Sequence, residues 1–79
     1  MSSQIGRMGS VSYTDGKFSL PNKERFNIKN DGDEAVELTV VLDKMADGTS
    51  VTTKFEPGWN PEIVREIIGG DVTNIKWGY

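Results

Sequence analysis

The fold depends most on one stretch, Phe55-Glu56-Pro57-Gly58-Trp59-Asn60-Pro61-Glu62-Ile63-Val64-Arg65-Glu66-Ile67-Ile68-Gly69-Gly70. Asn60 suits a helix N-cap, because its side-chain oxygen can accept a hydrogen bond from a free N–H of the first turn. Pro61 suits the first helical position, where no N–H is needed, and Gly69-Gly70 suits a left-handed C-cap. Four apolar residues share one stripe of a helical wheel: Ile63, Val64, Ile67 and Ile68. The stretch therefore predicts one short helix at about 61–68.

Alternation of apolar and polar residues predicts strands in the rest of the chain. The pattern is strongest over Val36–Leu42, and it recurs over Val51–Phe55 and Val72–Tyr79. The dipeptide Asp15-Gly16 predicts a tight turn before two shorter strands. A helix of about two turns is not stable alone, because helix nucleation is costly, so its apolar stripe is expected to pack on the sheet.

The predicted fold is mainly β. Turn signals recur about every ten residues, as in a small antiparallel β-sandwich or barrel, here of five to six strands. The segment Phe26–Val40 resembles the hairpin between strands B and C of immunoglobulin-like domains, which implies an Ig-like sandwich. Residues 1–10 are polar and glycine-containing and predict an extended N-terminal arm, and residues 11–79 predict a single β-rich domain.

Size and charge limit how the domain can be stabilised. A chain of 79 residues buries a small core, and without cysteine no disulfide can support it, which leaves self-association as one source of further stability. Residues 1–29 have a net charge of +3 and residues 30–79 of −6, which suits pairing within or between subunits. The acidic overall charge of −3 argues against nucleic-acid partners. A membrane partner is not expected, since no apolar run approaches about 20 residues and no signal-peptide core is seen.

The residue types argue against catalysis, so no enzyme activity, cofactor or metal is predicted. Without histidine and cysteine, Ser-His and Cys-His arrangements are excluded. The acidic turn around Gly32 suggests a calcium loop, but an EF-hand needs a glutamate six residues after the glycine, where this chain has Leu38. We interpret the cluster Asp31, Asp33 and Glu34 as a polar turn.

Partner contact is the remaining role for conspicuous side chains. Trp59, Trp77 and Tyr79 are large aromatics that either complete the core or anchor an interface. Ile5 and Met8 are the only apolar side chains of the predicted arm besides Met1. The candidate partner-binding residues are Ile5, Met8, Trp59 and Tyr79.

Three segments together resemble small virion proteins of tailed bacteriophages, in particular head auxiliary (decoration) proteins: Phe18–Phe26, Val36–Leu42 and Phe55–Val64. The resemblance implies a compact β domain that is made in the host cytoplasm and binds the outer capsid lattice, with the N-terminal arm reaching adjacent subunits and so bridging them. Its partners would be the major capsid protein or other virion subunits, with self-association as a further option.

Two alternatives remain open at this stage. The chain could be a tail or connector component of the same kind of particle. It could also be an Ig-like binding module that stacks a glycan on Trp59 or Trp77 during host-surface adhesion.

Overall fold

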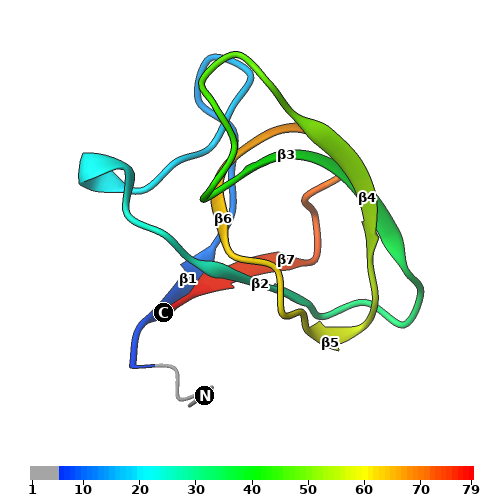
Figure 1. Ribbon diagram of the computed structural model, residues 1–79. Helices are drawn as coiled ribbons and strands as arrows, with labels where there is room; N and C mark the ends of the chain where they lie inside the picture. Colours follow the sequence, from blue (N-terminus) through cyan, green and yellow to red (C-terminus); the bar gives the residue numbers. More distant parts are fainter. Residues whose placement is uncertain (1–5) are drawn as a thin grey trace.

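The structure, a computed structural model, describes residues 6–79 (Figure 1). This part of the chain is built from strands joined by turns, with one short 3-10 helix. In chain order the elements are β1 (Met8–Ser10), η1 (Pro21–Lys23), β2 (Asn27–Asn30), β3 (Val36–Leu42), β4 (Val51–Phe55), β5 (Gly58–Trp59), β6 (Val64–Gly70) and β7 (Ile75–Gly78). The predicted strands at 36–42 and 51–55 are confirmed with the same bounds.

The strands form two antiparallel sheets. One has four strands in the order β1-β7-β2-β5, and the other has three in the order β4-β3-β6. Backbone bridges from Phe18 to Ile67 and from Phe26 to Val64 join the sheets along β6. The predicted mainly β, sandwich-type fold is therefore confirmed, with seven strands among residues 6–79. Its strand order differs from that of immunoglobulin constant domains, in which the first and last strands lie in different sheets.

The predicted helix at 61–68 is wrong, because most of that stretch is β6. Its pairing with β3 shifts register twice: Thr39, Val40, Val41 and Leu42 face Gly69, Ile67, Glu66 and Val64. Ile68 and Arg65 are thus extra residues in β6. Each such bulge shifts the side-chain alternation by one position.

The bulge at Arg65 explains why the sequence of β6 resembles that of a helix. Val64 and Ile67 lie three residues apart, yet both are fully buried in the core. Regular alternation would have sent one of them to solvent, but the bulge at Arg65 lets both point inward. A spacing of three is also the spacing of one helix face, so the pattern of apolar residues did not distinguish the two structures.

Asn60 is buried and serves as a loop tie instead of an N-cap. Its side-chain oxygen accepts a hydrogen bond from the Glu56 N–H at 3.1 Å, and its amide nitrogen donates to the carbonyls of Glu56 and Gly58 at 3.0 and 3.1 Å. Its backbone N–H donates to the Ile28 carbonyl at 2.9 Å. These bonds satisfy backbone groups that would otherwise be buried unpaired, and they hold β5 beside β2.

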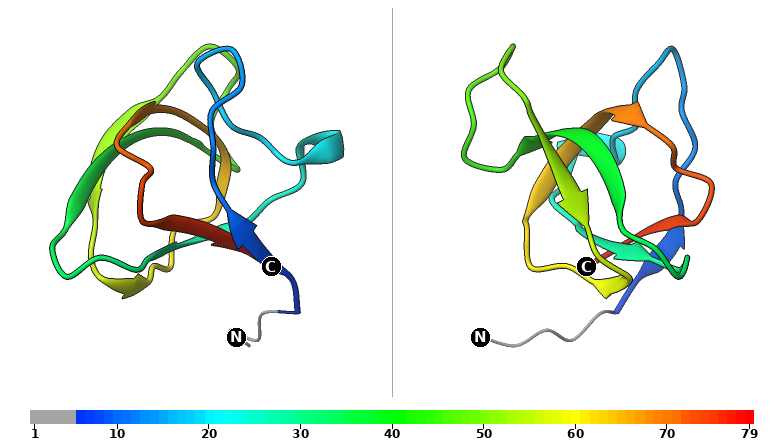
Figure 2. Two further views of the ribbon diagram at one scale, coloured as in Figure 1. Left: turned by 180° about the vertical axis from the view of Figure 1, so that it is seen from behind. Right: turned by 90° about the vertical axis from the view of Figure 1, so that its right-hand side faces the viewer.

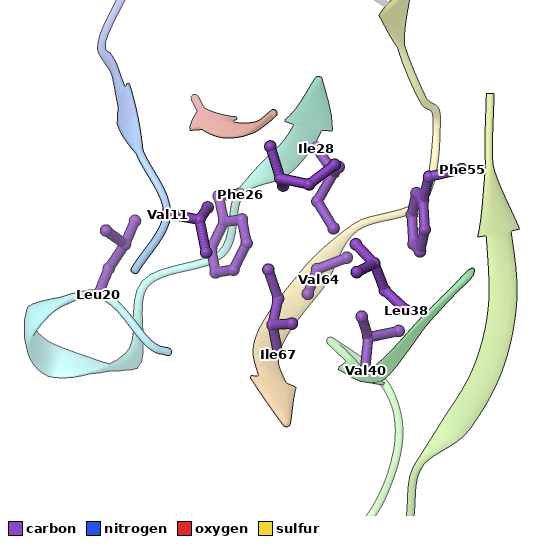
Figure 3. Packing of buried hydrophobic residues seen from close by; sticks show 10 residues of the cluster. Val11, Leu20, Phe26, Ile28, Leu38, Val40, Phe55, Val64 and Ile67 are labelled. Atoms are coloured by element: carbon purple, nitrogen blue, oxygen red, sulfur yellow. The ribbon is translucent and has the colours of Figure 1, made fainter. Parts of the chain in front are cut away.

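The core lies between the two sheets (Figure 3). Its largest members, Phe26 and Phe55, are at most 1% exposed. The buried cluster consists of Val11, Leu20, Phe26, Ile28, Leu38, Val40, Phe55, Val64, Ile67 and Ile75. At Gly70 the backbone of β6 comes too close to β3 for a side chain, because a Cβ there would lie 2.6 Å from the Glu37 carbonyl oxygen.

Two further predictions concern the N-terminal third. The tight turn at Asp15-Gly16 is confirmed: Thr14 and Lys17 exchange backbone hydrogen bonds of 2.8 and 3.2 Å across it, and both central residues have positive φ. Of the predicted arm, residues 1–5 lie outside the described residues, while residues 6–10 run along β7 and include β1. Figure 2 shows that β1 ends up beside the C-terminus.

The bulged strand makes a prediction that a helix would not make. Ile67→Ala should lower the free energy of unfolding by about 2–5 kcal/mol, because it leaves a cavity in the core. Ile68→Ala should cost much less, since Ile68 is 38% exposed. Urea unfolding of the two variants measures the difference. Equal losses, as expected if both residues lay on one buried helix stripe, would contradict the strand.

Candidate interaction surface

The surface most suited to binding is the outer face of the four-stranded sheet. Cross-strand partners share a face, and successive residues alternate between faces. Ile28 pairs with Trp77, and Asn30 pairs with Ile75, on the face toward the core. The residues between them therefore point away from it. The outer face of the four-stranded sheet carries Met8, Ser10, Asn27, Lys29, Trp59 and Lys76.

Two of the predicted contact residues, Met8 and Trp59, lie on this face. Met8 lies on edge strand β1 and is 52% exposed, and Trp59 lies on the opposite edge strand β5 and is 42% exposed. Strands β1 and β5 are the two edges of this sheet (Figure 1). Large apolar side chains with this much solvent exposure, tryptophan above all, are usual anchors of an interface.

The centre of the outer face is polar and organised by one carboxylate. The Asp31 carboxylate forms ion pairs with both lysines of the face, at 3.2 Å from Lys29 Nζ and 3.4 Å from Lys76 Nζ. The hydrogen bond from Lys29, supported by that from Lys76, lowers the pKa of the Asp31 carboxyl below its usual value. The face thus presents two fixed cations beside Trp59, which pairs directly with Lys29 across β5 and β2.

Tyr79 and Trp77 point to the other side of the sheet. Their rings stack with centroids 5.8 Å apart. Trp77 also covers Gly9, where a Cβ would lie 2.8 Å from its ring. The Tyr79 hydroxyl accepts a hydrogen bond from Arg7 at 3.1 Å and donates one to Glu24 at 3.2 Å. Both rings are half-buried and packed against the core, so neither joins Trp59 on the outer face.

The remaining predicted contact residue, Ile5, lies outside the described residues. The sequence indicated a polar turn at Asp31, and it did not single out Lys29 or Lys76. Alternation placed Lys29 and Lys76 on the polar sides of predicted strands, which was a usable signal. That β2 and β7 are neighbours, and hence that these lysines share Asp31, follows only from the sheet order.

A second feature is an open hollow of about 510 Å³ beside Tyr79. Its charges balance: Lys23 and Arg25 face Glu24 and Asp43, and Arg25 pairs with Asp43 at 3.5 Å. Among residues 6–79, no group of three acidic, histidine or cysteine side chains is placed to hold a metal ion. Over the same residues, no helix is long and apolar enough to cross a membrane.

The class of this protein is defined by its fold and by this surface, because comparisons with known proteins gave no match. No protein-family model matches the chain, and neither a curated protein nor a solved structure matches it. The class that the structure defines is a small antiparallel β-sandwich with an exposed, charge-organised sheet face.

The ion pairs of Asp31 predict a dependence of stability on pH. A carboxyl whose pKa is lowered by folding contributes stability above its unfolded pKa, and the contribution is lost as the pH falls through the folded value. We expect the free energy of unfolding to fall between about pH 5 and about pH 2. Asp31→Asn should reduce this fall without abolishing it, because folding also lowers the pKa of Asp47 through Arg65.

Urea unfolding of wild type and variant across this pH range measures the effect. The matched control is Asp33→Asn, since Asp33 makes no ion pair within residues 6–79. An Asp31→Asn variant with the same pH profile as wild type would show that the two lysine contacts contribute nothing.

Proposed function

We propose that this protein is a non-enzymatic structural component of a bacteriophage particle, a capsid auxiliary (decoration) protein that stabilises the shell by bridging neighbouring capsid subunits. Contact with the shell is made by the outer face of the four-stranded sheet. The virion assignment is supported by the resemblance of Phe18–Phe26, Val36–Leu42 and Phe55–Val64 to such proteins.

The observation that carries the proposed binding mode is the joint exposure of Met8 and Trp59 on a rigid sheet face. The sandwich buries its own core, with Ile28 and Phe55 fully enclosed. The domain can therefore dock ready-made, and binding costs little ordering of the backbone. Trp59 supplies a rigid apolar anchor, and the lysines held by Asp31 supply fixed charges around it.

Small contacts suffice for this role because the shell is symmetric. The domain measures 29 × 25 × 20 Å, so one sheet face offers a modest contact area. Where one copy touches two capsid subunits, the second contact forms at a high effective concentration, and weak contacts add up. Residues 6–10 are engaged with β7 of the same chain, so the proposed bridge uses the sheet face.

The virion assignment is tested on particles purified by density gradient from cells in which the encoding genome replicates. We expect mass spectrometry to find the protein in intact particles, and immunogold labelling to place it on the head. Label on the tail would favour a tail or connector component. Absence of the protein from washed particles would end the virion assignment.

The binding face is tested separately by Trp59→Ala. We expect at least a tenfold loss of copies per particle, the order of effect of removing an aromatic anchor of an interface, about 1.4 kcal/mol or more. Ile68→Ala is the matched control, because Ile68 is exposed to a similar extent but lies in the other sheet. If both variants are incorporated like wild type, the outer face of the four-stranded sheet is not the contact.

A glycan-binding function is the second candidate, and the surroundings of Trp59 favour it over a site at Trp77. An exposed indole beside the carboxylate and ammonium groups of Asp31 and Lys29 can stack a sugar ring and bond its hydroxyls. This function predicts binding on a glycan array that is lost in Trp59→Ala and kept in Ile68→Ala. An array without wild-type binding would eliminate it.

A further inference from the structure

The longest free strand edge of the described chain belongs to β4. The other sheet edges are short or covered: β1 has three residues, β5 has two, and β6 is bridged by Phe18 and Phe26. Val51–Phe55 pairs with β3 on one side, and no strand within residues 6–79 pairs with its other side. Figure 1 shows β4 on the outside of the molecule.

This edge lacks most devices that keep edge strands from pairing. It contains no proline, and its pairing with β3 is regular along all five residues. Its one charged residue, Lys54, stands opposite Glu37 in the pairing of β3 with β4. Edge strands that stay unpaired are usually bent by a bulge, interrupted by proline or shortened. The edge of β4 therefore remains competent for strand pairing.

We propose that β4 pairs with β4 of a second copy in antiparallel fashion, with Thr53 opposite Thr53, which joins two three-stranded sheets into one of six strands. The inference does not rest on the virion assignment. It concerns the sheet opposite the outer face that carries Met8 and Trp59, so a dimer of this kind leaves both outer faces free.

The strand is complementary to itself in this register. On the core side, Val51, which is 36% exposed, lies opposite Phe55 of the second copy, whose ring stays buried in its own core. On the solvent side, Thr52 lies opposite Lys54 of the second copy, so no like charges face each other.

Other registers fit less well. Centring the pair on Lys54 places the two ammonium groups directly opposite each other, which is unfavourable. A parallel, in-register pair likewise sets the two lysines side by side. Centring on Thr52 leaves Phe55 opposite Thr49, beyond the end of β4. Only the register centred on Thr53 uses the whole strand.

The first measurement is the mass of the full chain by analytical ultracentrifugation over a range of concentrations. We expect a monomer–dimer equilibrium. A monomer at every concentration overturns the proposal, and so does a closed trimer, because two β4 edges related by a twofold axis satisfy each other at two copies.

A matched pair of variants tests which edge is used. Thr52→Lys places a cation opposite Lys54 at two symmetric positions of the dimer, and Thr52→Glu places an anion there. Both variants lose the 2.8 Å contact between the hydroxyls of Thr52 and Thr39, so they differ only in charge. We expect dimer Kd to rise about tenfold in the first and fall about tenfold in the second at low salt.

Cysteine cross-linking tests the register, and the native chain has no cysteine to interfere. Directly opposed residues lie about 4.5–5.5 Å apart between Cα atoms, within reach of a disulfide. Thr53→Cys should therefore cross-link to itself. Thr52→Cys and Lys54→Cys should cross-link when mixed and poorly when alone. A dimer in which Thr53→Cys does not cross-link, and in which the two Thr52 variants have equal Kd, overturns the proposal.

Discussion

The bulged pairing of β6 with β3 is the constraint on which the rest of the structure depends. It brings Val64 and Ile67 into the core from positions three apart in the sequence. The same strand exchanges backbone hydrogen bonds with Phe18 and Phe26, which ties the long loop between β1 and β2 to the second sheet. Without the extra residue at Arg65, one of the two core side chains would face water.

Two buried asparagines form hydrogen bonds with backbone groups that the strand pairing leaves unpaired. Asn30 and Asn60 are the buried polar residues of the described chain. Asn30 donates to the carbonyls of Glu34 and Phe55 at 2.8 and 3.0 Å and accepts from the Gly32 N–H at 2.8 Å. The two side chains satisfy backbone groups where the chain passes between the sheets, and each amide does so with both its donor and its acceptor.

The sequence predicted the regular strands and missed the irregular one, for a physical reason. Val36–Leu42 and Val51–Phe55 alternate, and alternation has a single structural meaning when it is sustained. In β6 the bulge replaced alternation with a spacing of three, and capping-type residues at Asn60, Pro61 and Gly69 agreed with a helix. Nothing in the local sequence contradicted the helix. The bulge becomes visible only when β6 is paired with β3, which is distant in the sequence.

The sequence could predict that individual residues of the interaction surface are exposed. It could not predict that they lie on one face of a sheet. Exposure of Met8 and Trp59 was a reasonable expectation from their positions in short polar segments. Their placement on one face depends on β7 and β2 lying between β1 and β5. Strand order is set by packing across the whole domain. For the same reason Tyr79, a predicted partner-binding residue, is stacked on Trp77 instead.

The position of β7 has a consequence for synthesis of the protein. Of the strands described, β7 leaves the ribosome last, yet it lies between β1 and β2. A nascent chain can close the β3–β4–β6 sheet early, but the four-stranded sheet cannot form until Ile75–Gly78 is available. A chain truncated before β7 would lack the strand that joins the two margins of the outer face. Synthesis of β7 is therefore a condition for having that surface at all, and nascent chains that still lack β7 cannot present it.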